Sequence, residues 1–325
     1  MAEHTRALKF EDDGIGGAHL DLALKIPKVI SINEIVRPIG YAIPAYKNFH
    51  CIVEGNGVRA EGWGTGPLLE GIEKAKSEAF ERYVFSTTPK RSDKKQSSSG
   101  WAAHLTSLAA RDAAVAELIE RDSALSAWLN NGLYLTVPRN LWPIPLVRWS
   151  ESAVKMKIEF CEPHVLLSVG SNGCCATVIL KNRSGCAVTG HASGFNLEQS
   201  LVSAFFEALR SAHAALRFED FAQVMALHNG DETVHFSPGA NAMSYAYGVS
   251  LPELNVVTVD ESEITKYWER HLRQLAAHTE AARVDYFDLG DRVVAHAQLD
   301  NVLQIFWGPT PRSWTAINKH PHIVG

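Results

Sequence analysis

Two short stretches of the sequence combine acidic and basic side chains at helical spacing. They read Glu78-Ala-Phe-Glu81-Arg82 and Glu117-Leu-Ile-Glu120-Arg121. On a helix, residues three positions apart lie on one face, and the residue at the fourth position lies beside them. A third stretch, Glu207-Ala-Leu-Arg210, carries a related pattern. If these helices pack side by side, their carboxylates meet in one place.

Converging carboxylates need a counter-charge, because like charges repel and their burial is costly. Mg²⁺ would supply it, since this hard cation takes oxygen ligands and usually shares the phosphates of a bound substrate. The guanidinium groups of Arg82 and Arg121 could grip such a phosphate with paired hydrogen bonds. Mg²⁺, phosphate and arginine together are the parts that phosphoryl transfer requires.

A structural explanation competes with this hypothesis. Glu-x-x-Glu-Arg is common on solvated helix faces, where it makes only weak ion pairs. The apolar stripe through Leu69 and Phe80 lies opposite Glu81 and favours a solvated face for the first helix. In the second helix, Glu117 and Glu120 lie among alanines. That arrangement favours the close approach of another element or a ligand.

The third helix is apolar on nearly all sides, which predicts that it is buried. Its one polar stripe consists of Ser203, Glu207, Arg210 and Arg217. A polar stripe on a buried helix needs partners. Those partners form either a structural network or the lining of an internal polar cavity.

A repeated unit surrounds these glutamates. Three times, a glycine is followed by a ring residue and two small residues, and a helix then carries a glutamate 16 or 17 positions after the glycine. The glycines are Gly62, Gly100 and Gly190, and the glutamates are Glu78, Glu117 and Glu207. A hairpin precedes the first and third units. We therefore predict a duplicated hairpin–helix unit, at about 49–85 and 174–217, with an extra helix at about 105–130 between the copies.

Apolar alternation and Gly/Pro punctuation predict the remaining elements. We expect strands at Phe49–Val53, Val58–Trp63, Val165–Leu180, Cys186–His191, Arg283–Leu289, Arg292–Ala297 and Leu303–Trp307. We expect further helices at Pro67–Phe85, Leu197–Phe218 and Glu261–Ala282. The predicted fold class is α+β, with antiparallel or mixed sheets packed on helices, in a single domain over residues 1–325.

The composition is that of a globular protein, with 46% apolar and 21% charged residues. A net charge of −5 argues against a nucleic-acid-binding protein. The five cysteines form no C-x-x-C pair, so neither a zinc site nor a disulfide framework is indicated, and Cys174 and Cys175 are expected to be buried. No signal peptide and no apolar run long enough to cross a bilayer are visible, which predicts a cytoplasmic protein with no membrane partner.

The same motifs resemble the YcaO-like family. Ser98-Ser99-Gly100-Trp-Ala-Ala and the later Glu117-Leu-Ile-Glu-Arg-Asp122 are similar to the family's Ser-Asn-Gly-x-Ala-Ala element and its Glu-Leu-Ile-Glu-Arg-Asp helix, at the same spacing. The resemblance is specific over Gly62–Tyr83, Ser98–Trp128 and Gly190–Arg210, and it is looser elsewhere. It implies a YcaO-like fold in which these helices surround ATP and Mg²⁺.

The resemblance also implies roles for single residues. It implies Mg²⁺ ligands at Glu78, Glu81, Glu117, Glu120 and Glu207, and nucleotide contacts at Arg82, Ser99, Arg121 and Arg210. Among these, Glu117, Glu120 and Arg121 are the residues expected to be catalytic. The sequence departs from the family pattern at five positions. Trp63 stands where a Gly-Lys-Gly or Gly-Arg-Gly element is common, and Lys74, Ser99, Arg210 and Ala212 stand where the family usually has Ser, Asn, Gln and Arg, respectively.

The family's chemistry implies an ATP-dependent peptide cyclodehydratase. Such an enzyme phosphorylates backbone amides of a ribosomally synthesised precursor peptide and forms thiazoline or oxazoline rings, as in bacteriocin biosynthesis. A substrate Cys, Ser or Thr supplies the nucleophile, so no enzyme nucleophile is required. Two alternatives remain: thioamide or amidine formation, and a non-catalytic scaffold, which the third-helix departures favour.

Partners are implied in the same way. Met1–Tyr46 is short for the leader-peptide-binding domain that is often fused to such chains, so we expect a partner subunit to deliver the peptide. A flavin dehydrogenase is a further partner to consider. The loop Lys90–Lys95 is expected to be a solvated surface rather than a leader contact. His320-Pro321-His322 resembles a degenerate form of the alternating-proline tail of azoline-forming members.

Overall fold

A computed structural model describes residues 25–36, 43, 45–88, 97–129, 132–182, 187–216 and 254–303 of the 325-residue chain. These residues form an α+β fold, which confirms the predicted class. The predictions for Lys90–Lys95, Cys186, Arg217 and His320–His322 lie outside the described residues. Of the predicted strand Leu303–Trp307, only Leu303 is described, and it lies outside any strand.

The first hairpin–helix unit begins with two antiparallel strands, β2 (Lys47–Gly55) and β3 (Val58–Gly66). The turn between them places Asn56 and Gly57 at φ values of 50° and 73°, as in the tight hairpin turn that Asn-Gly favours. Strand β1 (Lys28–Ile35) pairs with the outer edge of β2 and gives the order β1-β2-β3. Helix α1 (Leu68–Thr87) follows the hairpin.

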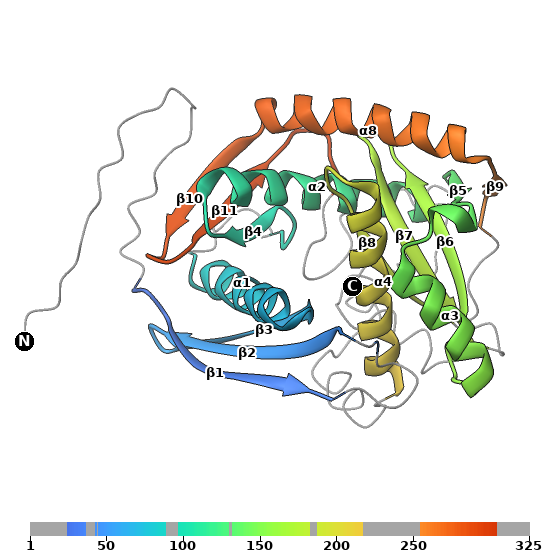
Figure 1. Ribbon diagram of the computed structural model, residues 1–325. Coiled ribbons are helices and arrows are strands. Elements are labelled where there is room, and N and C mark those ends of the chain that lie inside the picture. The colour runs from blue at the N-terminus through green and yellow to red at the C-terminus, as the bar shows by residue number, and fades with distance from the viewer. Residues whose placement is uncertain are drawn as a thin grey trace, which may run out of the picture.

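A second small sheet has the order β10-β11-β4. Its strands are β10 (Arg283–Asp288), β11 (Val293–Gln298) and β4 (Trp101–His104), all antiparallel. Helix α1 lies between this sheet and the first one, as Figure 1 shows. Its buried Ala79, Phe80 and Tyr83 share one apolar cluster with residues of both sheets. Helix α1 is therefore covered on two sides.

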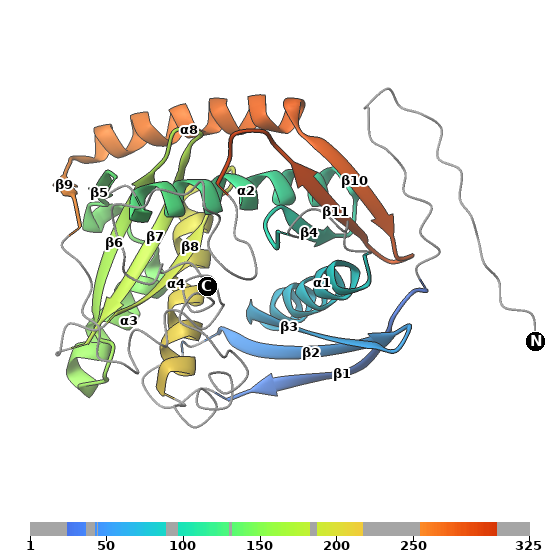
Figure 2. The same ribbon diagram turned by 180° about the vertical axis from the view of Figure 1, so that it is seen from behind.

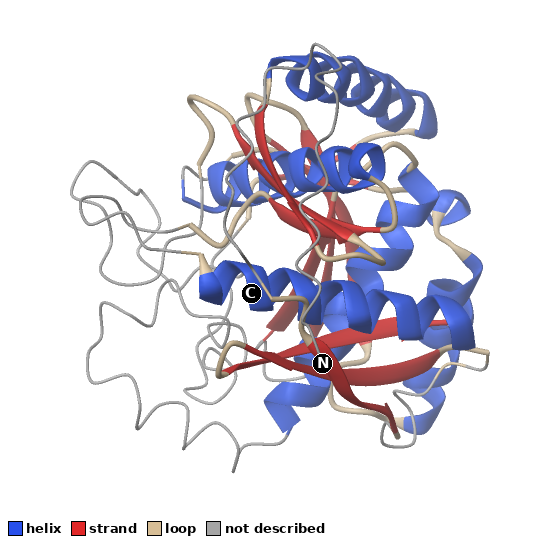
Figure 3. Cartoon of the chain, turned by 90° about the vertical axis from the view of Figure 1, so that its left-hand side faces the viewer, coloured by secondary structure: helices blue, strands red, loops and turns tan. Residues whose placement is uncertain are grey.

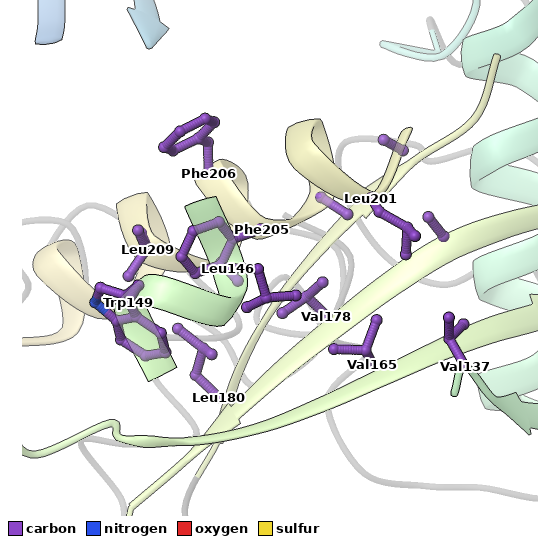
Figure 4. Packing of buried hydrophobic residues seen from close by; sticks show 14 of the residues in the cluster. Val137, Leu146, Trp149, Val165, Val178, Leu180, Leu201, Phe205, Phe206 and Leu209 are labelled. Carbon is purple, nitrogen blue, oxygen red and sulfur yellow. The ribbon is translucent and has the colours of Figure 1, made fainter. Parts of the chain in front are cut away.

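The third sheet has the order β8-β7-β6-β5-β9. Its strands are β8 (Ala187–Ala192), β7 (Cys174–Lys181), β6 (Glu162–Val169), β5 (Tyr134–Thr136) and β9 (Val256–Thr258), and only the β5–β9 pair is parallel. Helices α4 (Leu197–Leu216) and α3 (Ile144–Met156) pack on it. Figure 4 shows Phe205 and Leu209 of α4 meeting Trp149 of α3 and Leu180 of the sheet. The hairpin β7–β8 followed by α4 is the second hairpin–helix unit.

The fold has two halves: one consists of α1 with the two small sheets, and the other consists of the third sheet with α3 and α4. Helices α2 (Ser107–Leu129) and α8 (Glu261–Ala281) connect these two halves. The apolar residues Val115 and Leu118 of α2 pack on the β10-β11-β4 sheet, and Ala127 packs on the third sheet. Figure 2 shows α2 extending from the β10-β11-β4 sheet to the third sheet, with α8 running alongside it, and Figure 3 shows the alternating layers of helices and strands. Helix α2 is thus the element that both halves share.

Predicted burial of the adjacent cysteines is confirmed, because Cys174 and Cys175 are both buried in β7. Within the described part of the chain, every helix is too short or too polar to cross a membrane.

Glycines allow a strand to press directly on a helix in both hairpin–helix units. A side chain at Gly62 would overlap the backbone of Ala79 on α1, and one at Gly190 would overlap the backbone of Ala208 on α4. Each overlapped alanine stands one position after the leading glutamate, Glu78 or Glu207. The two units therefore have matching contacts, while their origin by duplication stays a prediction.

We predict that Gly190→Ala lowers the free energy of unfolding by about 1–3 kcal/mol or more, because the added methyl group forces β8 away from α4. Urea denaturation measures the change. Gly194→Ala is the matched control, since its added atom would lie 3.5 Å from the nearest neighbour, Ser200 Oγ. Equal stability of the two variants would contradict the close strand–helix packing.

Candidate functional site

Each leading glutamate accepts a hydrogen bond from the backbone of the glycine–ring segment that precedes its helix. The bonds join Glu78 Oε2 to Trp63 N (2.7 Å), Glu117 Oε2 to Trp101 N (2.9 Å) and Gly100 N (3.0 Å), and Glu207 Oε2 to His191 N (2.7 Å). Close packing at the glycine brings the following N–H within reach of the carboxylate. This contact explains why the glycine and the glutamate recur together at a fixed spacing in the sequence.

The second oxygen of each leading glutamate faces an arginine of its own helix. Glu78 Oε1 accepts a hydrogen bond from Arg82, Glu117 Oε1 lies 3.7 Å from Arg121, and Glu207 Oε1 lies 3.8 Å from Arg210. Arg210 also reaches Glu78 Oε2 on α1, at 3.6 Å. Both oxygens of each leading glutamate are thus engaged, and Arg210 links α4 to α1.

The trailing glutamates are held less firmly. Glu120 Oε2 accepts a long hydrogen bond from Ser193 N (3.3 Å), and Glu120 Oε1 lies 3.6 Å from Arg121. Glu81 has neither a hydrogen bond nor an ion pair among the described residues. It is half-buried and interacts electrostatically with Glu117, so the solvated face favoured by the α1 periodicity is wrong for this residue.

Burial and mutual repulsion make the glutamates hard to ionise. Burial, together with the Glu117 and Glu78 charges, raises the pKa of Glu81 well above its usual range. Burial raises the pKa of Glu117 to about 7 and the pKa of Glu120 to about 8, although Arg121 opposes both shifts. Burial also raises the pKa of Glu207. Arg121 is itself desolvated, but Glu120 and Glu117 raise its pKa above the usual value.

These residues fit a bound Mg²⁺ by their chemistry. Five carboxylates face three arginines (Arg82, Arg121 and Arg210), so the fully ionised cluster has two negative charges in excess. Glu81 offers oxygens that no described donor uses, and Mg²⁺ prefers oxygen ligands. In the described part of the chain, no three His, Cys, Asp or Glu side chains are already arranged around a metal position. The leading carboxylates turn toward N–H groups and arginines instead.

A cavity of about 400 Å³ opens beside the cluster. Of the predicted site residues, Glu120, Glu207 and Arg210 line it. The remaining glutamates, with Arg82 and Arg121, belong to the cluster next to the cavity. Ser99 is buried one residue before Gly100, its backbone N–H donates to Ser97 Oγ (3.0 Å), and it is not part of the cavity lining.

Other lining residues were not predicted as site residues. They include Trp63, Lys74, His191, Ser193 and Phe206. The repeated unit contained a signal for three of them, since Trp63 and His191 are its ring residues and Ser193 is its fourth residue. Lys74 stands one turn before Glu78, and its ammonium group lies 2.7 Å from Glu70. It therefore places a cation on the cavity wall.

His271 of α8 contacts two residues that line the cavity, Ser193 and Gly194. Its Nδ1 accepts a hydrogen bond from Cys174 N (3.3 Å), and its Nε2 lies 3.2 Å from both Gly194 O and Ser193 Oγ. Burial lowers the pKa of His271 to about 4, so the ring is neutral at pH 7 and Nε2 carries the proton. No sequence pattern connects His271 with the segment that it positions.

We predict that the metal-free protein loses stability as pH rises from about 6.5 to about 8.5, because a carboxyl group with a raised pKa holds a proton in the folded state that it releases on unfolding. Glu117 and Glu120 titrate in this window. His271 has the opposite effect on stability, because its pKa is lowered in the folded state and stability therefore increases with pH. This increase is nearly complete above the unperturbed histidine pKa of 6.5. Urea denaturation in EDTA measures the slope, and Glu120→Gln should reduce it. An unchanged slope in that variant would refute the assignment.

Comparison of the chain with known proteins identifies its family. A sequence model described as YcaO cyclodehydratase, ATP- and Mg²⁺-binding, matches residues 80–295. A search of curated protein sequences finds no significant match. Similar solved structures include YcaO from Methanopyrus kandleri bound with AMPPCP and Mg²⁺, with a TM-score of 0.53 and 13% identity over 87% of this chain and 90% of that one.

Two further structures are similar at 11% identity. One is the E. coli microcin synthetase McbBCD complex with pro-MccB17 bound, with a TM-score of 0.54 over 84% of this chain and 90% of that one. The other is a heterocyclase in complex with substrate and cofactor, with a TM-score of 0.56 over 86% of this chain but only 51% of that one. At these identities the likeness shows the fold.

The family match spans more than half of the chain and includes Glu81, α2 and Glu207. It confirms the predicted resemblance and, at the level of the family, the predicted cofactors ATP and Mg²⁺. The roles of individual residues stay predictions. This chain belongs to the YcaO family of cyclodehydratases, which bind ATP and Mg²⁺.

Proposed function

We propose that this protein is an ATP-dependent cyclodehydratase that converts backbone amides of a ribosomally synthesised precursor peptide into thiazoline or oxazoline rings. The observation that carries the proposal is the convergence of four glutamates from α1, α2 and α4 on Arg121, with Glu78 beside them, next to a cavity of about 400 Å³. A desolvated acidic cluster with arginines beside an open cavity suits a metal-bound polyphosphate better than a neutral ligand.

The proposal divides the cluster into two sets. Glu81 and Glu120 have the most weakly held carboxylates, so they are the first choice as Mg²⁺ ligands, with Glu117 beside them. Glu78 and Glu207 hold the strand backbones and complete the acidic surroundings. Bound Mg²⁺ would neutralise charge on the transferred phosphoryl group.

Arginines and the cavity wall are assigned to the nucleotide and the peptide. Arg121 and Arg82 keep the carboxylates apart and present N–H donors toward phosphate oxygens, with Arg210 and Lys74 on the wall. Ser99 contributes through the backbone segment that binds Glu117, rather than from the cavity lining. Because the wall also contains Trp63 and Phe206, it can exclude water around a peptide segment.

The reaction needs no nucleophile from the protein. A Cys, Ser or Thr side chain of the peptide attacks the preceding carbonyl carbon, and the resulting oxyanion receives the γ-phosphoryl group of ATP. The C–O bond then breaks and phosphate leaves with the former amide oxygen. The balance is one ring, one ADP and one phosphate, with the elements of water lost from the peptide. The protein contributes positioning and charge stabilisation.

Partners follow from the same proposal. The substrate is a precursor peptide, and a partner subunit that binds its leader delivers it, with a flavin dehydrogenase as a later partner that oxidises the rings. The McbBCD complex, which has pro-MccB17 bound, has a subunit of similar fold and supports the expectation of an assembly.

One observation favours a second function, that of a non-catalytic scaffold. Arg210 contacts both Glu78 and Glu207, and Arg82 also pairs with Glu78, so two of the five carboxylates are neutralised by two arginines of the chain itself. A scaffold that has lost ATP turnover could keep such a cluster for structural reasons alone.

We predict that the protein, incubated with ATP, Mg²⁺, its partner subunit and the precursor peptide of its own operon, releases one ADP for each water lost from the peptide. Mass spectrometry and an ADP assay measure the two quantities. Exchange of oxygen for sulfur would instead assign thioamide formation, and ring closure by an amine would assign amidine formation. An unchanged peptide, together with no heat of ATP binding in calorimetry, would identify the scaffold.

We predict that Glu81→Gln lowers ATP turnover about 100-fold or more, as expected from the loss of a few kcal/mol of charge stabilisation. Because Glu81 has no described partner and faces Glu117, the same change should leave the unfolding temperature equal or higher. Glu263→Gln on the surface of α8 is the control, since it removes an equal charge whose one ion pair among the described residues is with Lys266. Unchanged turnover in Glu81→Gln would refute the metal assignment.

A further inference from the structure

Arg210 differs from the other two arginines of the cluster in what it joins. Arg82 and Arg121 contact glutamates of their own helices, whereas Arg210 spans from Glu207 on α4 to Glu78 on α1. Its Nη1 lies 3.6 Å from Glu78 Oε2, and its Nη2 lies 3.8 Å from Glu207 Oε1. A cation therefore already stands between the two carboxylates that face each other across the helices.

The position of Arg210 allows it to leave. Its side chain is 42% exposed and lines the cavity, whereas the Arg121 side chain is 15% exposed. Both contacts of Arg210 are longer than 3.5 Å, so they are ion pairs without a direct hydrogen bond. Lys74 lines the same wall. A phosphate entering there would meet two cations, and Arg210 can exchange its loose carboxylate contacts for stronger phosphate contacts.

The charges divide the cluster into two parts. On the α1–α4 side, Glu78 and Glu207 are balanced by Arg210 together with Arg82, and their Oε2 atoms accept backbone N–H groups. On the α1–α2 side, Glu81 is close to Glu117 and has no described partner. A divalent cation approaching without a nucleotide is attracted to the second side, because a neutralised carboxylate pair attracts it little.

We propose that Arg210 acts as a built-in cation that closes the Glu78–Glu207 side of the cluster to divalent metal ions until a phosphate in the cavity draws its guanidinium away. Metal binding at that side is therefore coupled to nucleotide binding. This inference rests on the proposed function of the cluster as a metal site, and it goes further by assigning Arg210 a positioning role that controls when metal enters.

The test is metal binding by the full-length protein without nucleotide. Mn²⁺ is titrated into wild type, Arg210→Gln and Arg210→Lys, and free Mn²⁺ is measured by electron paramagnetic resonance. We expect Arg210→Gln to bind one additional Mn²⁺, or the same Mn²⁺ about tenfold more tightly, because removing a unit charge near 4 Å leaves Glu78 with Arg82 alone and Glu207 without its arginine, an excess of one negative charge. Arg210→Lys keeps the charge and should titrate as wild type does. Arg139→Gln, which removes an exposed arginine paired with Glu151, is the matched control.

Equal Mn²⁺ binding in wild type and Arg210→Gln would overturn the inference, and so would equally tight binding in Arg210→Lys and Arg210→Gln. If Arg210→Gln does not fold, Arg210→Met keeps the apolar stem without the charge and carries the same expectation. A final titration adds a non-hydrolysable ATP analogue. Failure of every protein to bind more Mn²⁺ than the analogue alone would refute the metal site itself, which is a different outcome from equal binding in wild type and variant.

Discussion

A single backbone contact organises this protein: a helix glutamate accepts the N–H of the residue that follows a glycine on the preceding strand. It occurs at Glu78, Glu117 and Glu207, on three helices from three parts of the chain. The missing side chain at Gly62 and Gly190 lets strand and helix touch, and the carboxylate satisfies a backbone donor that would otherwise be buried alone. Because each glutamate is fixed by its own strand, packing the three helices fixes the acidic cluster as well.

The burial of the acidic cluster opposes the stability of the fold. Burial desolvates Glu81, Glu117 and Glu120, and their raised pKa values mean that the folded protein retains protons there at neutral pH. A hydrophobic replacement of similar size would relieve this cost. Strongly raised pKa values in a buried cluster of this kind are typical of functional sites.

Much of the fold was predictable because its signals are local. The helices, the Asn56-Gly57 hairpin and the spacing of glycine and glutamate follow from neighbouring residues. The contacts between residues that are far apart in the chain do not follow from local signals. Glu81 lies opposite the apolar stripe of α1, yet it is half-buried, because the helical wheel cannot show that α1 has neighbours on several sides. The contacts of Arg210 with Glu78 and of His271 with Ser193 join residues far apart in the chain, and no period or motif encodes them.

The cavity wall is held in place by residues that lie later in the sequence than the acidic helices. His271 of α8 holds Ser193 and Gly194, and strands β10 and β11 complete the sheet that buries Trp101 beside Glu117. During synthesis on a ribosome, α1, α2 and α4 therefore emerge before α8, β10 and β11, whose residues contact the cavity wall and cover Trp101. The contacts that hold the cavity wall and cover Trp101 can therefore form only once the segment through Gln298 has been synthesised.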